Sequence, residues 1–243
     1  MTLSNKTLKY RIYTILFIVF SLVSIHANSS CVILLHGLAR SSGSMDKLEQ
    51  ALSKNGFYPV NLGYPSREHS IDILAMKAIT PALAECSKDM EVNFVTHSLG
   101  GILVRQYLSQ QQIPNLKRVV MLGPPNKGSE VVDKLGAAPG FTFINGVAGL
   151  QLGTSELSVP NSLGPADFDV GIIAGNKSIN WMLSLLIPEV DDGKVSVERT
   201  KLEGMNDHIE VPATHPFMMN NETVIRQVIF YLHKGRFEGK QKQ

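Results

Sequence analysis

Residues 92–105 read VNFVTHSLGGILVR, and they join an apolar strand pattern to a helical pattern across one serine. The strand pattern ends directly before Ser98, and two glycines follow it. Ser98 is therefore expected on a sharp strand-to-helix turn at the carboxyl edge of a sheet, which is the geometry of a nucleophile elbow. Gly100 supplies the second glycine of the G-x-S-x-G pattern, whereas Thr96 replaces the first.

Apolar runs alternate with helical patterns on both sides of this elbow. The alternation is typical of βαβ units and predicts an α/β fold with a mostly parallel sheet of about six strands flanked by helices. We expect strands at 31–35, 58–62, 92–96, 118–122, 170–174 and 208–211, and helices at 45–55, 71–87, 99–111 and 222–232.

The chain has 243 residues, 44% of them hydrophobic and 18% charged, which suits one globular domain. Its formal charge of +2 includes Lys6, Lys9 and Arg11, and residues 1–27 contain no Asp or Glu. Without residues 1–27 the chain has 20 basic and 21 acidic residues, a balance of −1. No basic block remains, so we expect no nucleic-acid partner.

Residues 1–27 resemble a signal peptide. The three basic residues precede an apolar run at 12–25, and Ala27, Asn28, Ser29 and Ser30 are small. Cleavage after Ala27 or Ser29 predicts an exported chain, periplasmic or secreted, with its domain at 28–243. The alternative is an uncleaved N-terminal membrane anchor.

The only cysteines are Cys31 and Cys86. Cys31 opens the first predicted strand, and Cys86 ends a helix just before the strand at 92–96. If these strands are parallel neighbours, both sulfurs lie at the amino-terminal edge of the sheet, so an exported chain could pair them in a disulfide. Two buried thiols are the alternative.

Residues 136–165 interrupt the alternation with a stretch rich in Gly, Pro and scattered apolar residues. Side chains such as Phe141, Phe143 and Leu152 suit a wholly solvated loop poorly. We interpret the segment as a lid or cap over an apolar cleft. The alternative is an irregular segment that packs on the core.

A serine nucleophile needs a base and an acid, in the chain order Ser, Asp or Glu, His. His215, in the loop after the last predicted strand, is the preferred base, since His208 falls inside that strand. His97 is expected to point away from the reaction and pack behind the elbow. The preferred acid is Asp192, because Asp-Gly forms a turn that can present a carboxylate. Asp191 is the alternative acid.

The reaction also needs donors for an oxyanion. The turn His36-Gly37-Leu38 follows the first strand and can present the backbone N–H of Leu38, and Leu99 follows Ser98 and can supply a second N–H. No cluster of metal ligands is evident, so neither a metal nor an organic cofactor is expected.

The segments HGLARS, THSLGGILVR, VVMLGPPNKGSE, DGKV and THPFM resemble the α/β-hydrolase fold family, and within it bacterial lipases and carboxylesterases. The resemblance covers nearly all the chain after residue 27. It implies an ester hydrolase with Ser98 as nucleophile, Asp192 as acid, His215 as base, and Leu38 and Leu99 as oxyanion donors. Thr96 departs from the family pattern, and the first strands of larger members are not recognised.

We therefore expect a serine hydrolase that cleaves carboxylic esters, with a small-molecule ester or lipid as substrate. Contact with a membrane surface is left open. An acyltransferase or thioesterase would use the same triad, and a non-catalytic binding protein would need only the cleft.

Overall fold

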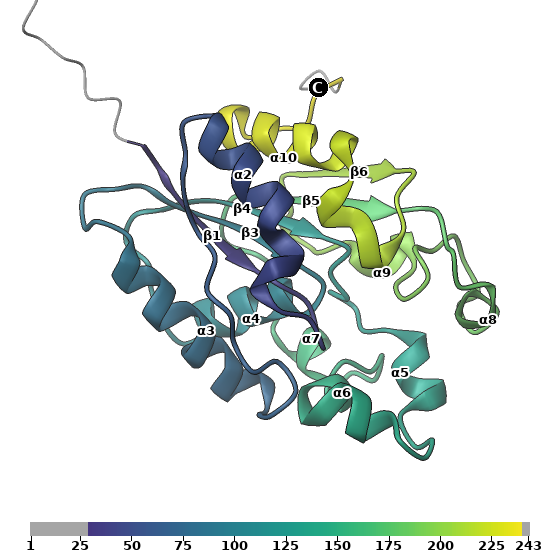
Figure 1. Cartoon of the computed structure of the whole chain (residues 1–243). Coiled ribbons are helices and arrows are strands. Elements are labelled where there is room, and N and C mark those ends of the chain that lie inside the picture. The colour runs from purple at the N-terminus through teal and green to yellow at the C-terminus, as the bar shows by residue number, and fades with distance from the viewer. Residues whose placement is uncertain (1–28, 240–243) are drawn as a thin grey trace, which may run out of the picture.

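The computed structural model describes residues 29–239, which form a six-stranded sheet with helices on both faces (Figure 1). Every strand pairing is parallel, and the strand order is β2-β1-β3-β4-β5-β6. The strands are β1 (Cys31–Leu35), β2 (Tyr58–Val60), β3 (Val92–His97), β4 (Leu116–Leu122), β5 (Val170–Gly175) and β6 (Asp207–Val211).

All six predicted strands are present. β4 begins two residues earlier than predicted, and β2 ends two residues earlier. Every residue of β1 and β5 is buried, because helices cover both faces of the sheet there. The sequence prediction of a mostly parallel α/β sheet is therefore confirmed.

The main helices divide between the two faces. On one side lie α2 (Asp46–Lys54) and α10 (Glu222–Lys234), and on the other lie α3 (Ile71–Glu85) and α4 (Leu99–Leu108) (Figure 1). Along β1, Val32 and Leu34 pack in the core on the α2 and α10 side, whereas Ile33 and Leu35 pack in the core on the α3 and α4 side. This alternation follows from the two-residue period of a strand.

Cys31 and Cys86 form a disulfide, with their Cα atoms 5.8 Å apart. β1 and β3 are parallel neighbours, with Cys31 opposite Val92. The disulfide therefore joins the start of β1 to the end of α3 at the amino-terminal edge of the sheet, which is the arrangement predicted from the two strands.

Residues 136–165 are not structureless. The segment contains α6 (Phe141–Leu150) and α7 (Val159–Ser162), and α5 (Glu130–Leu135) precedes it. No regular period was recognised there, and Gly146, with φ of 66°, breaks α6 internally. Figure 1 shows α5 and α6 together beside one end of the sheet.

Two further helices and two short 3-10 helices complete the described chain. They are η1 (Ser42–Met45), α8 (Trp181–Ser184), α9 (Val197–Thr200) and η2 (His215–Asn220). Within residues 29–239, no helix is both long and apolar enough to cross a bilayer. The predicted export segment, residues 1–27, lies outside the described residues.

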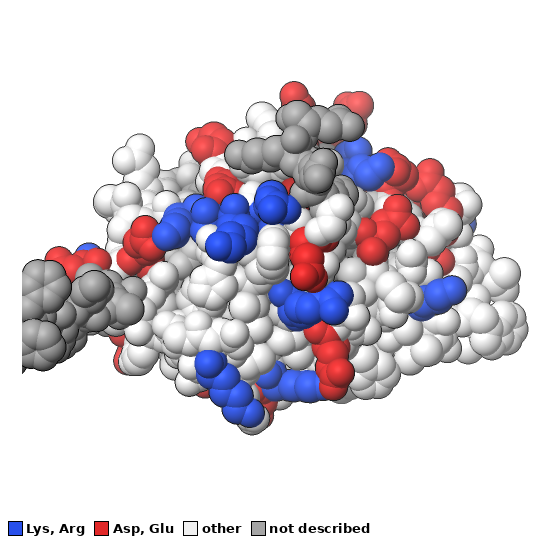
Figure 2. All heavy atoms as spheres, turned by 90° about the horizontal axis from the view of Figure 1, so that it is seen from above, with Lys and Arg blue, Asp and Glu red and all other residues white. Residues whose placement is uncertain are grey.

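Charges of both signs are mixed on the surface near the C-terminal end of the described chain. Figure 2 views the molecule from above Figure 1, and it shows groups of Lys and Arg side chains lying among Asp and Glu side chains. On that face, basic side chains do not merge into one broad patch of the kind that tracks a phosphate backbone.

Candidate active site

Ser98 sits at the junction of β3 and α4 in a backbone conformation that non-glycine residues rarely adopt, with φ of 52° and ψ of −118°. Strain of this kind persists where the surrounding structure fixes it, and it is common at functional sites. The turn also requires small neighbours. A Cβ atom on Gly100 would lie 2.7 Å from the carbonyl oxygen of Leu35, so only glycine lets α4 approach β1 this closely.

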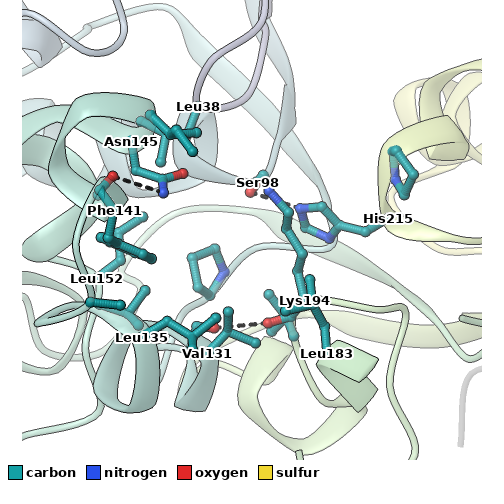
Figure 3. Close-up of a pocket in the computed structure, with 18 of the residues that line it drawn as sticks. Leu38, Ser98, Val131, Leu135, Phe141, Asn145, Leu152, Leu183, Lys194 and His215 are labelled. Atoms are coloured by element: carbon teal, nitrogen blue, oxygen red, sulfur yellow. Dashed lines mark hydrogen bonds between the residues drawn. The ribbon is translucent and has the colours of Figure 1, made fainter. Parts of the chain in front are cut away.

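The described fold brings the predicted base and acid to this serine. The Nε2 atom of His215 lies 3.0 Å from Ser98 Oγ, and its Nδ1 atom lies 2.6 Å from Asp192 Oδ2. Since a carboxylate only accepts, His215 Nδ1 carries the proton and donates to Asp192. Nε2 of the neutral ring is then the acceptor for the Ser98 hydroxyl (Figure 3).

Asp192 is completely buried, and its carboxylate has other donors besides His215. Its Oδ1 atom accepts from the backbone N–H groups of Lys194 and Val195, each at 3.0 Å. The alternative acid, Asp191, accepts instead from Ser184 Oγ at 2.8 Å and from the Gly193 N–H at 2.6 Å. The Asp192-Gly193 turn therefore directs Asp192 to His215 and Asp191 toward α8.

The two backbone N–H groups named as oxyanion donors flank the serine. Leu99 is the first residue of α4, so its N–H has no acceptor in a preceding helical turn. Leu38 belongs to the turn after β1, and a Cβ atom on its neighbour Gly37 would lie 3.2 Å from Ser98 Cβ. Within residues 29–239 we find no protein acceptor for the Leu38 N–H.

His97 has a closer relation to the base than the sequence predicted. Its ring is buried, and its Nε2 atom lies 2.9 Å from the carbonyl oxygen of His215. Because a carbonyl only accepts, His97 Nε2 must carry a proton and donate it. Burial, followed by repulsion from His215, holds the pKa of His97 well below its ordinary value. The predicted packing of His97 at the elbow is confirmed, but its ring does not point away from the reaction: a neutral His97 fixes the backbone of His215.

A pocket of about 390 Å³ opens beside the serine and the base. Its walls are mostly apolar and come from the turn after β1, from α5 and α6, and from the segment around α8 (Figure 3). The apolar lining side chains include Leu38, Val131, Leu135, Phe141, Ile144, Leu152 and Leu183. The segment that was interpreted as a lid therefore supplies part of the pocket wall.

Several lining residues were not recognised in the sequence. Val131 and Leu135 come from α5, which no predicted helix covers. Gly123, which does not line the pocket, follows β4 directly with φ of +53°, and a Cβ atom there would lie 2.9 Å from Asp192 Oδ2 and 3.2 Å from His215 Nδ1. A glycine directly after a strand at the carboxyl edge was the available signal for this close approach.

The described residues contain no group of three or more His, Cys, Asp or Glu side chains placed to hold a metal ion. The polar groups that converge on the pocket are instead a hydroxyl, an imidazole and a carboxylate in series. That series is the set used to activate a serine, with the base oriented by a third group.

The chain resembles known proteins in structure but matches none of the compared family models or curated sequences. Among solved structures, the mature lipase BlEst2 of Bacillus licheniformis is similar with a TM-score of 0.63 at 18% identity, covering 86% of this chain and 93% of that one.

Two further structures are similar. The metagenomic carboxyl esterase MGS0156 has a TM-score of 0.59 at 17% identity, covering 79% of this chain and 66% of its own. Aspergillus fumigatus lipase B has a TM-score of 0.58 at 14% identity, covering 86% of this chain and 53% of its own. The predicted resemblance is therefore confirmed at the level of the fold: this chain has the α/β-hydrolase fold of known lipases and esterases.

Proposed function

We propose that this protein is a serine hydrolase that cleaves carboxylic esters, with lipid or other acyl esters as its substrate class. The observation that carries the proposal is the continuous hydrogen-bonded series from Ser98 Oγ through His215 to the buried Asp192, at 3.0 and 2.6 Å. The fold shared with lipases and esterases supports it.

The first half of the reaction forms an acyl-enzyme. Ser98 Oγ attacks the ester carbonyl carbon while His215 Nε2 takes the hydroxyl proton, and Asp192 holds the imidazolium that forms. The backbone N–H groups of Leu38 and Leu99 donate to the oxyanion. The attack produces a tetrahedral intermediate. When it collapses, the bond between the carbonyl carbon and the alcohol oxygen breaks, and the alcohol oxygen receives a proton from His215.

The second half releases the acid. His215 removes a proton from a water molecule, the resulting hydroxide attacks the acyl carbon, and Ser98 leaves with the proton held by His215. A different acceptor in place of water would make the protein an acyltransferase, and a thiol leaving group would make it a thioesterase. Hydrolysis is the proposed reaction because the solved structures that share this fold include lipases and a carboxyl esterase.

Exposed apolar side chains on α6 and α8, two helices that contribute residues to the pocket wall, favour lipid substrates. Phe143 and Ile144 on α6 are 87% and 58% exposed, and Trp181 on α8 is 70% exposed. Exposed apolar side chains that form a patch are typical of surfaces that bind other molecules or lipids. We include contact with a membrane or micelle surface in the proposal. Replacing Phe143 and Trp181 by serine should then lower hydrolysis of vesicle-borne esters more than hydrolysis of dissolved ones.

Export belongs to the same proposal. The signal-peptide pattern at residues 1–27 supports a periplasmic or secreted protein, and a disulfide is usual in such compartments. Cell fractionation, with mass measurement of the mature N-terminus, tests it. A mature chain that still begins at Met1 in the membrane fraction would favour the anchor.

The experiment that tests the activity compares p-nitrophenyl esters of increasing acyl length on the wild-type protein and on Ser98→Ala. We expect turnover by the wild type and a loss of at least about 10³-fold in the variant, since the nucleophile is absent. Asp192→Asn is a second test variant and should also lose turnover. Asp191→Asn is its matched control and should not, because only Asp192 contacts His215. No turnover of esters or thioesters, together with no labelling of Ser98 by a phosphonate, would overturn the proposal in favour of a binding protein.

A further inference from the structure

Two basic side chains share the catalytic pocket with Ser98 and His215. Arg40 follows the turn after β1, and Lys194 lies in the turn that begins at Asp192. Each residue keeps some solvent-exposed surface in the described structure. Neither side chain takes part in the proposed steps of ester cleavage.

Neither cation is neutralised by the protein. Within residues 29–239, no acidic side chain forms an ion pair with Arg40 or Lys194. Arg40 Nη2 donates a long hydrogen bond of 3.4 Å to the carbonyl of Pro216, beside the base. The nearby carboxylate, Asp192, is already bonded to His215 and to two backbone N–H groups.

The backbone of Lys194 is held by the catalytic machinery itself. Its N–H donates to Asp192 Oδ1 at 3.0 Å, and its carbonyl accepts from Ser129 Oγ at 2.8 Å. Figure 3 shows the side chain running beside His215 toward Ser98. Desolvation, followed by repulsion from Arg40, lowers the pKa of Lys194, with Asp192 opposing that shift. An anion placed between the two cations would relieve their repulsion.

The pocket has an apolar side and a basic side. In Figure 3, Leu135, Phe141 and Leu152 lie across the cavity from Lys194 and His215, with Ser98 between the two sides. An acyl chain suits the apolar wall, because burying it there removes hydrocarbon from water. The alcohol part of the same ester would then extend toward Arg40 and Lys194.

We propose that Arg40 and Lys194 form an anion subsite for the alcohol part of the ester, so that the preferred substrates carry a phosphate or carboxylate close to the scissile bond. A glycerophospholipid and a soluble anionic ester both have this chemistry. The inference rests on the proposed function and names the substrate class within it. Charge-assisted hydrogen bonds to such a group are the strong kind, and two donors would fix its position.

The test is a ratio of kcat/KM values for matched esters. One pair is 4-(hexanoyloxy)benzoate and its neutral methyl ester, and the other is phosphatidylglycerol and diacylglycerol in neutral detergent micelles. We expect the anionic member to be favoured about tenfold, in line with one charged hydrogen bond. Lys194→Met and Arg40→Met should each lower the ratio about fivefold to tenfold. Lys194→Glu should bring it below one.

Lys54→Met is the matched control, since Lys54 ends α2 and does not line the pocket. A purely structural role for Lys194 would lower kcat/KM for both esters and leave the ratio unchanged. A ratio that stays within about twofold in all three variants would overturn the subsite. If the anionic ester is preferred only in the micelle pair, the subsite binds lipid headgroups. If it is preferred only in the soluble pair, the subsite binds small anionic esters.

Binding separates this inference from the proposed function. The Ser98→Ala protein can be titrated with octyl phosphate and octanol by calorimetry, which requires no turnover. Tighter binding of octyl phosphate that is lost in Ser98→Ala/Lys194→Met supports the subsite even if no ester is hydrolysed. Equal binding of the two probes would overturn the subsite even if esters are hydrolysed.

Discussion

At the scale of single residues, Thr96 shows what the departure from the G-x-S-x-G pattern does. The side chain is completely buried in β3, and its hydroxyl has no hydrogen-bond partner among the described residues. A buried hydroxyl without a partner costs about 1–3 kcal/mol. We expect Thr96→Val to raise the free energy of unfolding by about 1 kcal/mol in urea denaturation, because valine keeps the shape without the hydroxyl.

The matched control for this substitution is Thr200→Val. Thr200 is buried to the same degree, but its Oγ1 donates to the Val197 carbonyl at 2.6 Å and contacts His208 Nε2 at 2.9 Å. Valine there should be destabilising. If both variants lose stability equally, the Thr96 hydroxyl is hydrogen-bonded in the folded protein, contrary to the prediction.

His97 gives a prediction for the pH dependence of stability. The pKa of His97 is held well below its ordinary value by burial and then by His215, with smaller contributions from Arg40 and Lys194. Below about pH 6.5 the unfolded chain binds a proton at this ring that the folded chain does not. The free energy of unfolding therefore falls as the pH falls, by at most about 1.4 kcal/mol per pH unit.

His97→Gln keeps an N–H donor near the His215 carbonyl and removes the titration. We expect its free energy of unfolding to fall less steeply between pH 7 and pH 5 than that of the wild type, as measured by denaturation at each pH. Parallel slopes would show that His97 is not the group that takes up the proton.

At the scale of elements, the sequence predicted what periodicity can reveal. The strands were recognised because buried parallel strands form continuous apolar runs such as CVILL, and the elbow because Ser98 separates a strand pattern from a helical one. By contrast, α5, α6 and α7 are short, between four and ten residues long. Helices of that length depend on tertiary contacts, which leave little periodic signal.

The same limit applies to the site. The turn Asp192-Gly193 and the loop at His215 could be named from residue type and chain order. The choice between Asp191 and Asp192 depended on which carboxylate the turn directs to the base, and the hydrogen bond between His97 and the His215 carbonyl depends on tertiary distances. Neither property is encoded in local spacing.

Arg105 of α4 shows how the segment that contains α7 is held to α4. Its buried guanidinium donates to the carbonyls of Pro160 and Gly164, each at 2.9 Å, and to Asn126. Burial lowers the pKa of Arg105 to about 10, which leaves it charged at neutral pH. Arg105→Met should lower the free energy of unfolding by at least about 2 kcal/mol, because it leaves several buried acceptors without donors.

Arg226→Met is the control for Arg105→Met in the same denaturation experiment. Arg226 pairs with Glu238 at 3.1 Å, but their side chains are 64% and 48% exposed. Exposed pairs contribute about 0–1 kcal/mol. A loss in Arg105→Met no larger than that in Arg226→Met would show that the α7 segment does not depend on this contact.

At the scale of the whole molecule, the catalytic series and the disulfide lie at opposite edges of one sheet. Ser98 and Asp192 follow the carboxyl ends of β3 and β5, whereas the disulfide joins Cys31 and Cys86 at the amino ends of the strands. The disulfide can therefore stabilise the domain without touching the reacting groups.

Chain entropy predicts the size of this contribution. The disulfide closes a loop with a sequence separation of 55 residues. Closing a loop of that length restricts the unfolded chain by up to about 4 kcal/mol in the chain-entropy account. We expect Cys31→Ala/Cys86→Ala to lower the free energy of unfolding by about 2–4 kcal/mol. Because the site is at the other edge, kcat/KM for a short ester should stay within about twofold at a temperature where the variant is folded.

Reductant supplies the internal control. Dithiothreitol should lower the denaturation midpoint of the wild type toward that of the double variant and leave the double variant unchanged. A wild-type midpoint that reductant does not alter, although free thiols become detectable, would mean that the link does not restrict the unfolded chain. A large loss of kcat/KM in the folded double variant would instead mean that the start of β1 is coupled through the sheet to the turn that carries Leu38.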